Sequence, residues 1–154
     1  KYQGSYESIT RIIEQYSSLP QLDKINYWQQ VVFSWIIGNA DMHLKNFSLY
    51  SPQINRYILS PTYDQVSTKV VMPEDTEEMA LYLNGFKKKL LVYDFREAMF
   101  STGISEIVTN RILSDFSKFR DKWFACIDAS FISDDQKLSY KALIDNRLET
   151  LAKE

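Results

Sequence analysis

Apolar and aromatic residues recur at intervals of three and four along most of the chain. This period is typical of amphipathic helices, and it predicts helices over residues 5–18, 23–37, 95–102, 105–130 and 133–152. The second of these ends in one of the most apolar stretches of the sequence. We therefore expect that helix to be buried.

Single residues mark where these helices begin and end. Pro20 ends the first helix or caps the loop after it, and Asp23 is suited to cap the start of the second. Gly38 follows the second helix, where glycine tolerates the left-handed backbone that ends a helix. Gly103 stops the third helix, and Ser133 opens a capping box before the last one.

Extended structure is predicted between the second and third helices. Residues 46–50 and 56–59 read as two short strands joined by a turn. A second hairpin is predicted within residues 82–92, around the turn-forming pair Asn84-Gly85. The acidic stretch 73–78 reads as exposed. The predicted fold class is mainly α with a small β-hairpin element.

Composition supports a globular chain with a sizeable core. The 154 residues are 45% hydrophobic and 14% aromatic, with four glycines and four prolines, which excludes collagen-like and disordered classes. The length suits one domain over residues 1–154. The net charge of −2 argues against direct binding of nucleic acid or of a membrane surface. No apolar run approaches the 18 or so residues of a membrane span.

Cys126 is the single cysteine of the chain. A lone cysteine excludes an intrachain disulfide and fits a reducing compartment, so we expect a cytoplasmic protein. Because Cys126 lies in an apolar run, it reads as a small core residue. One histidine and one distant cysteine disfavour a zinc site. The absence of a G-x-S-x-G segment disfavours a serine hydrolase.

A polar cluster follows the buried second helix directly. Asp41 and Asn46 have the spacing D-x-x-x-x-N, which is that of the kinase catalytic loop. In such chemistry a carboxylate accepts the proton of the attacking hydroxyl, while amide and carboxylate oxygens hold Mg²⁺ against the phosphates. Asp41 is the candidate base, and Asn46 is a candidate metal ligand. Asp64, directly after the predicted hairpin, is the second candidate ligand. A cation from Lys45, or less readily from His43, would lie near the γ-phosphate.

The same residues also admit a structural interpretation. An Asp and an Asn after a helix often cap or turn the backbone. A single histidine is more often a structural hydrogen-bonding residue than a ligand or a base. Asp64 by itself would serve as a helix cap. The residues alone therefore leave phosphoryl transfer and a purely structural role both open.

Four segments resemble those of the HipA-like toxin kinases. Residues 37–49 resemble the motif I-G-N-x-D-x-H-x-K-N-F-S-L, and residues 59–68 resemble L-x-P-x-Y-D-x-x-S-T. Residues 1–7 resemble K-Y-x-G-S-Y-E, and residues 83–85 resemble L-N-G. The four matches follow the family's order along the whole chain.

This resemblance implies a fold, a reaction and partners. The family comprises bacterial serine/threonine protein kinases of toxin–antitoxin systems, with a β-rich lobe, an ATP cleft and a large helical lobe similar to the C-lobe of a protein kinase. It implies that Asp41 is the catalytic base and that Asn46 and Asp64 bind Mg²⁺, with ATP as the phosphate donor. His43 and Lys45 match motif positions. Family targets include aminoacyl-tRNA synthetases, and the usual partner is a small DNA-binding antitoxin.

The chain departs from the family in one respect. It has no glycine-rich phosphate loop and no strand with an ATP-pairing lysine, and it starts at Lys1 rather than at methionine. We therefore expect residues 1–154 to be the C-terminal lobe of a longer kinase, and the isolated chain to be weakly active or inactive.

Two other functions compete with this hypothesis. One is a non-catalytic module that binds an antitoxin or a target. The other is a small-molecule kinase of the aminoglycoside or choline type, which carries H-x-D-x-x-x-x-N. Here His43 follows Asp41 and residue 39 is Asn, which favours the toxin family.

Overall fold

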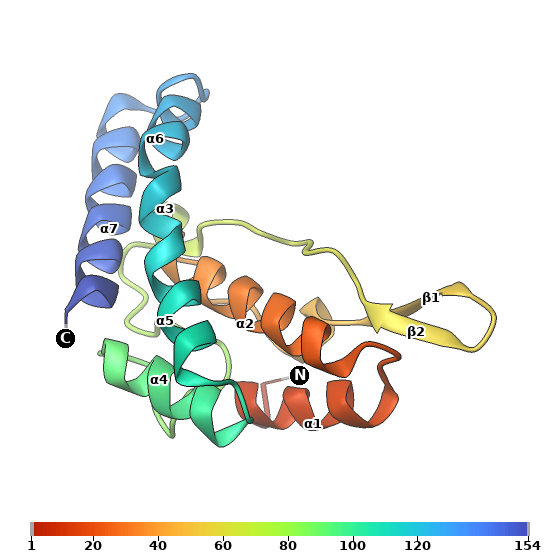
Figure 1. Ribbon diagram of the computed structural model, residues 1–154. Helices are drawn as coiled ribbons and strands as arrows, with labels where there is room; N and C mark the ends of the chain where they lie inside the picture. Colours follow the sequence, from red (N-terminus) through yellow and green to blue (C-terminus); the bar gives the residue numbers. More distant parts are fainter. Residues whose placement is uncertain (1, 154) are drawn as a thin grey trace.

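The computed structural model describes residues 2–153, so Lys1 of the first resembling segment lies outside the described residues. The fold is mainly helical with one two-stranded antiparallel sheet, as the sequence predicts (Figure 1). The elements in chain order are α1 (Tyr6–Tyr16), α2 (Pro20–Ile36), η1 (Leu44–Asn46), β1 (Leu49–Gln53), β2 (Arg56–Leu59), α3 (Thr68–Val71), α4 (Val92–Ser101), α5 (Glu106–Asp115), η2 (Phe116–Phe119), α6 (Arg120–Asp128) and α7 (Asp134–Ala152).

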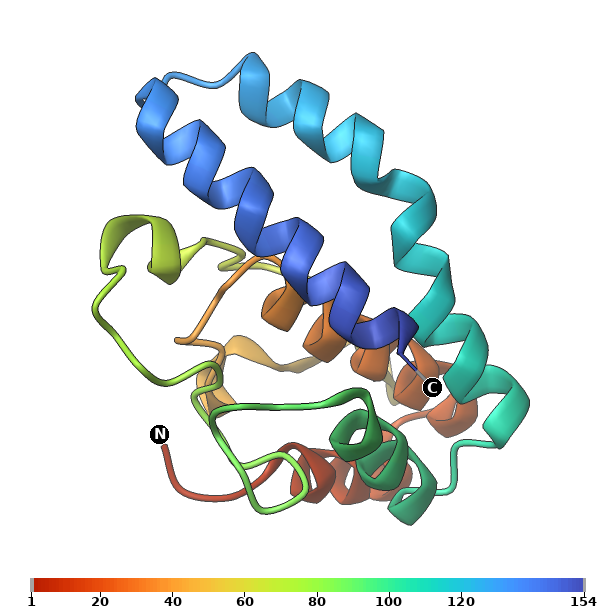
Figure 2. The ribbon, with the colours of Figure 1, turned by 90° about the vertical axis from the view of Figure 1, so that its left-hand side faces the viewer.

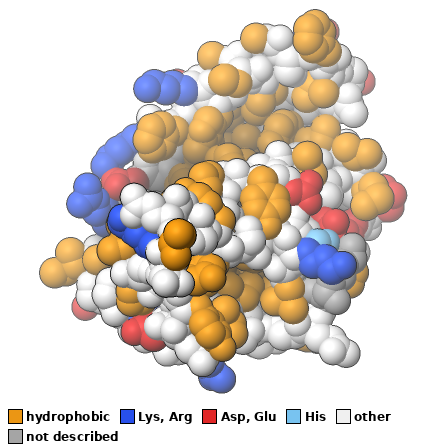
Figure 3. All heavy atoms as spheres, turned by 90° about the vertical axis from the view of Figure 1, so that its right-hand side faces the viewer, with side chains coloured by type: hydrophobic (Ala, Val, Ile, Leu, Met, Phe, Trp, Pro, Cys, Tyr) orange, Lys and Arg blue, Asp and Glu red, His pale blue; other side chains and the backbone are white. Residues whose placement is uncertain are grey.

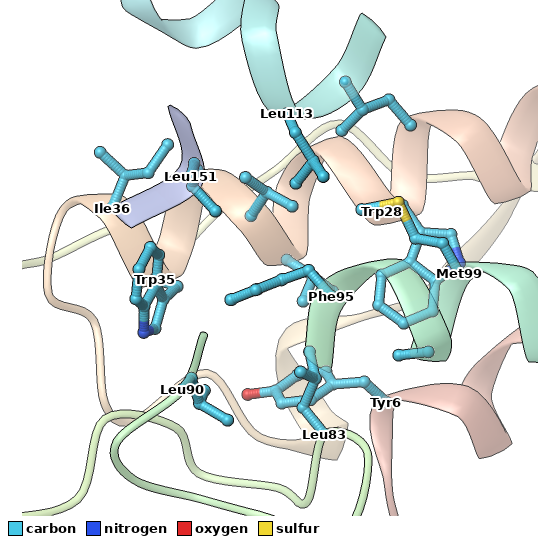
Figure 4. Close-up of a cluster of buried hydrophobic side chains, with 14 of the residues drawn as sticks. Tyr6, Trp28, Trp35, Ile36, Leu83, Leu90, Phe95, Met99, Leu113 and Leu151 are labelled. Atoms are coloured by element: carbon cyan, nitrogen blue, oxygen red, sulfur yellow. The ribbon is translucent and has the colours of Figure 1, made fainter. Parts of the chain in front are cut away.

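Helix α2 is the centre of the core, as its apolar sequence predicts. Trp28, Val32 and Trp35 on this helix are at most 1% exposed. Helices α1, α5 and α7 all contact α2. In Figure 4, Phe95 of α4 lies between Trp28 and Trp35, and its ring centroid is 4.9 Å from that of Trp35. Full burial of such aromatic side chains contributes on the order of 2–3 kcal/mol each, so α2 is a fixed platform for the loop that follows it.

The start of α2 differs from the prediction. The helix begins at Pro20, which occupies its first turn, because the missing N–H of proline costs nothing there. Asp23 is therefore not the N-cap. Its buried carboxylate instead accepts hydrogen bonds from Ser17 Oγ at 2.6 Å and from the Leu59 amide at 2.8 Å. Asp23 thus ties the end of β2 to the helix platform.

The end of α2 matches the prediction. Gly38 follows the helix with φ of +74°, in the left-handed region. A Cβ atom at this position would lie 2.6 Å from Leu143 Cδ2 on α7. Glycine is required here both by the backbone conformation and by the close approach of α7.

The hairpin begins later than predicted. Residues 44–46 form the short 3₁₀ turn η1, and β1 starts at Leu49. Leu49 pairs with Leu59, and a bulge interrupts the register before the turn. Asn55 in that turn has φ of +60°. The hairpin projects away from the helices (Figure 1).

The second predicted hairpin is reduced to its turn. Leu83 and Phe86 form an isolated antiparallel bridge around Asn84-Gly85, without strands on either side. Tyr82 instead forms a parallel bridge with Ser5, at the start of α1. A long-range contact with the N-terminal segment therefore takes the place of the predicted strand.

The predicted helix over residues 105–130 is divided. It consists of α5, the 3₁₀ turn η2 and α6, and α6 runs antiparallel beside α7 (Figure 2). Cys126, which the sequence predicts to be a core residue, is exposed and borders an apolar cavity that residues of α2 and α7 also line. The apolar Ile107 of α5 is 83% exposed. Leu138 of α7 is 69% exposed, although its side chain is apolar. The α6–α7 pair extends beyond the main core, so each of these helices is covered on one side.

The acidic stretch 73–78 is mostly exposed, but its last residue is not. Glu78 accepts hydrogen bonds from Arg147 Nη1 at 2.6 Å and from Trp35 Nε1 at 2.9 Å. The Arg147 guanidinium also lies 4.1 Å from the centroid of the Trp35 ring. Burial lowers the pKa of Arg147, and the Glu78 carboxylate opposes that effect. This pair fixes the loop before α4 to helices α2 and α7.

None of the helices within residues 2–153 combines the length and the hydrophobicity that crossing a lipid bilayer requires.

Candidate active site

The loop at residues 38–46 is held in place from two sides. The Thr68 hydroxyl accepts a hydrogen bond from the Ala40 amide at 2.9 Å and donates one to the Gly38 carbonyl at 3.1 Å. From the other side, Tyr6 donates its hydroxyl to the Met42 carbonyl at 2.8 Å. Burial raises the pKa of the Tyr6 phenol well above its usual value, so this donor stays protonated.

Asp41 is half-buried at the tip of this loop. Its Oδ1 atom accepts a hydrogen bond from the Tyr2 hydroxyl at 2.8 Å. Asp41 lines a cavity of about 570 Å³, together with Thr68, Asp75 and Lys87. Asp41 is therefore both fixed by a neighbour and open to a molecule that enters the cavity.

Asn46 and Asp64 meet at the base of the hairpin. Asn46 is 3% exposed, and its side-chain amide donates a short hydrogen bond to the Asp64 carboxylate. The Asn46 Oδ1 atom is buried and has no hydrogen-bond partner among residues 2–153. Asp64 is exposed and has φ of +55°, a backbone conformation that a non-glycine residue adopts at some cost.

Asn39 links the two halves of the site. Its Nδ2 atom donates to the Asp64 carbonyl at 2.9 Å, and its Oδ1 atom accepts from the Asp41 amide at 3.1 Å. Only 1% of this residue is exposed. Asn39 lies within the polar cluster, but its sequence context alone predicts no structural or catalytic role for it. Its bond to Asp64 spans 25 positions and has no local signal in the sequence.

His43 and Lys45 occupy different environments. His43 is 7% exposed, its amide donates to the Asp41 carbonyl at 2.8 Å, and its Nδ1 atom is buried without a partner in the described part of the chain. Lys45 is exposed, and its backbone carbonyl accepts from the Tyr63 hydroxyl at 2.9 Å. The Lys45 ammonium forms no ion pair within residues 2–153. Figure 3 shows that acidic, basic and histidine side chains are present together on one face of the molecule.

The donor set fits one kind of metal ion. No group of three or more His, Cys, Asp or Glu side chains among the described residues is arranged to hold a metal. Mg²⁺, however, is usually bound by one or two protein carboxylates together with phosphate oxygens and water. A carboxylate at Asp64 and an unpartnered amide oxygen at Asn46 are the hard oxygen ligands that this ion prefers.

Comparison of the sequence with known protein families identifies the family of this chain. The sequence profile of the HipA-like C-terminal domain matches residues 1–123, which is most of the chain. The chain belongs to the family of HipA-like C-terminal domains. The match includes the loop at 38–46, the hairpin and Asp64.

Curated relatives carry kinase names. "Putative kinase Y4dM" of Sinorhizobium fredii is 42% identical over 74 residues, which are 47% of this chain and 18% of that protein. A "Putative kinase" of Haemophilus influenzae is 33% identical over 63 residues, which are 41% of this chain and 18% of that protein. The matched part is thus less than a fifth of the length of these curated relatives.

A solved structure has the same fold. The chain is similar to one from a Shewanella oneidensis MR-1 complex of HipA, HipB and their operator DNA, with a TM-score of 0.77 and 18% sequence identity. The likeness covers 96% of this chain and 35% of that one. It shows that this HipA-like C-terminal domain has the fold of a HipA-complex chain across almost its whole length.

Proposed function

We propose that this domain is the C-terminal catalytic lobe of a toxin-type serine/threonine protein kinase. It would transfer the γ-phosphate of ATP to a hydroxyl group of a protein. Family membership, the kinase names of the relatives and the geometry of the site support this proposal.

The observation that carries the proposal is the meeting of Asn46 and Asp64. Two oxygen-bearing side chains from either end of a hairpin touch, and the buried amide oxygen of Asn46 has no partner among the described residues. A buried polar atom without a partner costs on the order of 1–3 kcal/mol. A bound Mg²⁺ would remove that cost and would neutralise charge on the phosphates of ATP.

Asp41 is the residue proposed to act on the acceptor. Phosphoryl transfer needs a carboxylate within hydrogen-bonding reach of the attacking hydroxyl, so that the proton has an acceptor as the new bond forms. The cavity of about 570 Å³ beside Asp41 gives an acceptor side chain a place to enter. Lys45, which is exposed and without an ion pair in residues 2–153, is proposed to approach the transferring phosphate.

The proposal extends to partners. The chain covers 35% of the structural neighbour, so the rest of the ATP cleft is proposed to come from a β-rich lobe elsewhere in the full-length protein. The neighbour's complex contains HipB and operator DNA, which supports a small DNA-binding antitoxin as the partner of this protein. An aminoacyl-tRNA synthetase or another translation factor is the proposed acceptor, and cytoplasm the proposed location.

The proposal is tested by phosphate incorporation. The full-length protein is incubated with γ-labelled ATP, Mg²⁺ and dephosphorylated casein as a generic serine-bearing acceptor, beside an Asp41→Asn variant. We expect labelling of the protein or of casein by the wild type, and a loss of about 10²–10⁴-fold in the variant, the range for general acid–base catalysis. Equal labelling by both proteins would refute Asp41 as the base.

A further inference from the structure

Tyr2 reaches the proposed catalytic carboxylate from outside the loop. Its hydroxyl donates to Asp41 Oδ1 at 2.8 Å across 39 positions of sequence. Its ring meets the imidazole of His43 edge-on, with the ring centroids 5.3 Å apart and the planes at 73°. Tyr2 therefore touches both Asp41 and the side chain next to it.

The segment that carries Tyr2 is anchored to the same loop a second time. Four residues further on, the Tyr6 amide donates to the Tyr82 carbonyl at 2.9 Å, and the buried Tyr6 hydroxyl donates to the Met42 carbonyl at 2.8 Å. Two tyrosines of one segment thus hold two adjacent loop residues, Asp41 and Met42. The position of Tyr2 is tied to the position of the loop.

The hydrogen bond from Tyr2 leaves half of the carboxylate available. A carboxylate has two acceptor oxygens, and the Oδ2 atom of Asp41 accepts no hydrogen bond from residues 2–153. The terminal torsion of an aspartate is otherwise broad, so a bond to one oxygen selects its orientation. An acceptor hydroxyl can therefore bind Oδ2 while Tyr2 holds Oδ1.

We infer that Tyr2 is a positioning residue for the phosphoryl transfer proposed above, on which this inference rests. It orients the Asp41 carboxylate so that one oxygen is held and the other is presented to the acceptor hydroxyl. His43 supports Tyr2 through the edge-on ring contact, and so acts on Asp41 indirectly. Tyr2 exchanges no proton and forms no covalent bond in this role.

The test uses the full-length protein with γ-labelled ATP, Mg²⁺ and dephosphorylated casein. Tyr2→Phe keeps the ring contact with His43 and removes the hydroxyl. We expect kcat to fall about tenfold, because misorientation of a reacting group costs rate rather than binding. The KM values for ATP and casein and the melting temperature should stay those of the wild type. Tyr50→Phe is the matched control, since Tyr50 lies exposed on β1, and it should change none of these values.

Each other outcome contradicts the inference. A kcat of Tyr2→Phe within twofold of the wild type would show that the hydroxyl does not position Asp41. A higher kcat/KM for casein would show that Tyr2 competes with the acceptor. A lower melting temperature alongside the lower kcat would make the role structural. No labelling by the wild type, or equal labelling by Asp41→Asn, would refute the proposed phosphoryl transfer itself and the role of Tyr2 with it.

Discussion

The side-chain amide of Asn46 donates a hydrogen bond to the carboxylate of Asp64, although 18 positions of sequence separate the two residues. The hairpin between them explains this contact. Strand β1 leaves the helices, β2 returns antiparallel to it, and the pairing of Leu49 with Leu59 closes the base. The pairing register of the hairpin therefore brings Asn46 and Asp64 into contact.

Replacing Asp64 tests the proposed Mg²⁺ site. Asp64→Asn removes the charge but keeps an oxygen that can accept the hydrogen bond from the buried Asn46 amide, and asparagine tolerates the positive φ of this position. The melting temperature of the full-length protein should therefore stay within about 2 °C of the wild type. We expect Mg²⁺-dependent ATP binding, measured by calorimetry, to weaken by at least about tenfold, because a carboxylate ligand of this ion is lost.

Asp135→Asn is the matched control for that substitution. Asp135 is also exposed, and it lies at the start of α7, outside the site. It removes the same charge without touching the hairpin base. If both variants bind ATP and Mg²⁺ as the wild type does, Asp64 is not a metal ligand.

Gly38 and Gly85 form a natural pair for testing the end of α2. Both have positive φ, but a Cβ atom would lie 2.6 Å from Leu143 at Gly38 and would meet nothing within 4 Å at Gly85. We expect Gly85→Ala to cost about 1 kcal/mol of unfolding free energy from backbone strain, and Gly38→Ala about 3 kcal/mol because overpacking adds to it. Urea unfolding measures both values, and equal costs would contradict the close approach of α7.

The pair of Arg147 and Glu78 is expected to matter for stability. The side chain of Arg147 is 8% exposed and that of Glu78 is 19% exposed, so Arg147→Met would leave a nearly buried carboxylate without its cation. We expect a loss of about 3 kcal/mol in the free energy of unfolding. Arg111→Met removes an arginine that is 81% exposed from its ion pair with Asp115, and it should cost under about 1 kcal/mol. Similar losses in the two variants would show that burial does not strengthen the inner pair.

Features that depend on neighbouring residues were predictable from the sequence. Gly38 ends α2 and Ser133 caps α7 because each acts on the backbone within a few positions. The polar loop after α2 was located for the same reason. Asp41, Asn46 and Asp64 were singled out by their spacing, and the structure brings Asn46 and Asp64 together.

Features that depend on distant contacts were not predictable in this way. Asp23 was expected to cap α2, but the amide of Leu59, 36 positions away, uses its carboxylate. Cys126 lies in an apolar run, yet the hydrophobic period does not reveal how closely neighbouring elements pack against that face, and Cys126 stays exposed beside the cavity between α6, α2 and α7. The hydrogen bonds of Asn39 with Asp64 and of Tyr2 with Asp41 join residues far apart in the sequence, so only the fold reveals them.

Measurements on the isolated 154-residue chain test whether this domain alone is sufficient for ATP binding and phosphate transfer. The chain covers 35% of the HipA-complex chain whose fold it shares, and ATP in a kinase-like site is enclosed between two lobes. We therefore expect the purified chain to bind ATP and Mg²⁺ at least about a hundredfold more weakly than the full-length protein, in line with the loss of half of the binding surface. Calorimetry measures the two affinities, and labelled ATP with casein measures transfer. Because Asp41 is proposed to act on the acceptor hydroxyl while Asn46 and Asp64 hold Mg²⁺, Asp41→Asn should change the ATP affinity of the isolated chain little. Phosphate turnover by the isolated chain at the rate of the full-length protein would show that one lobe is enough.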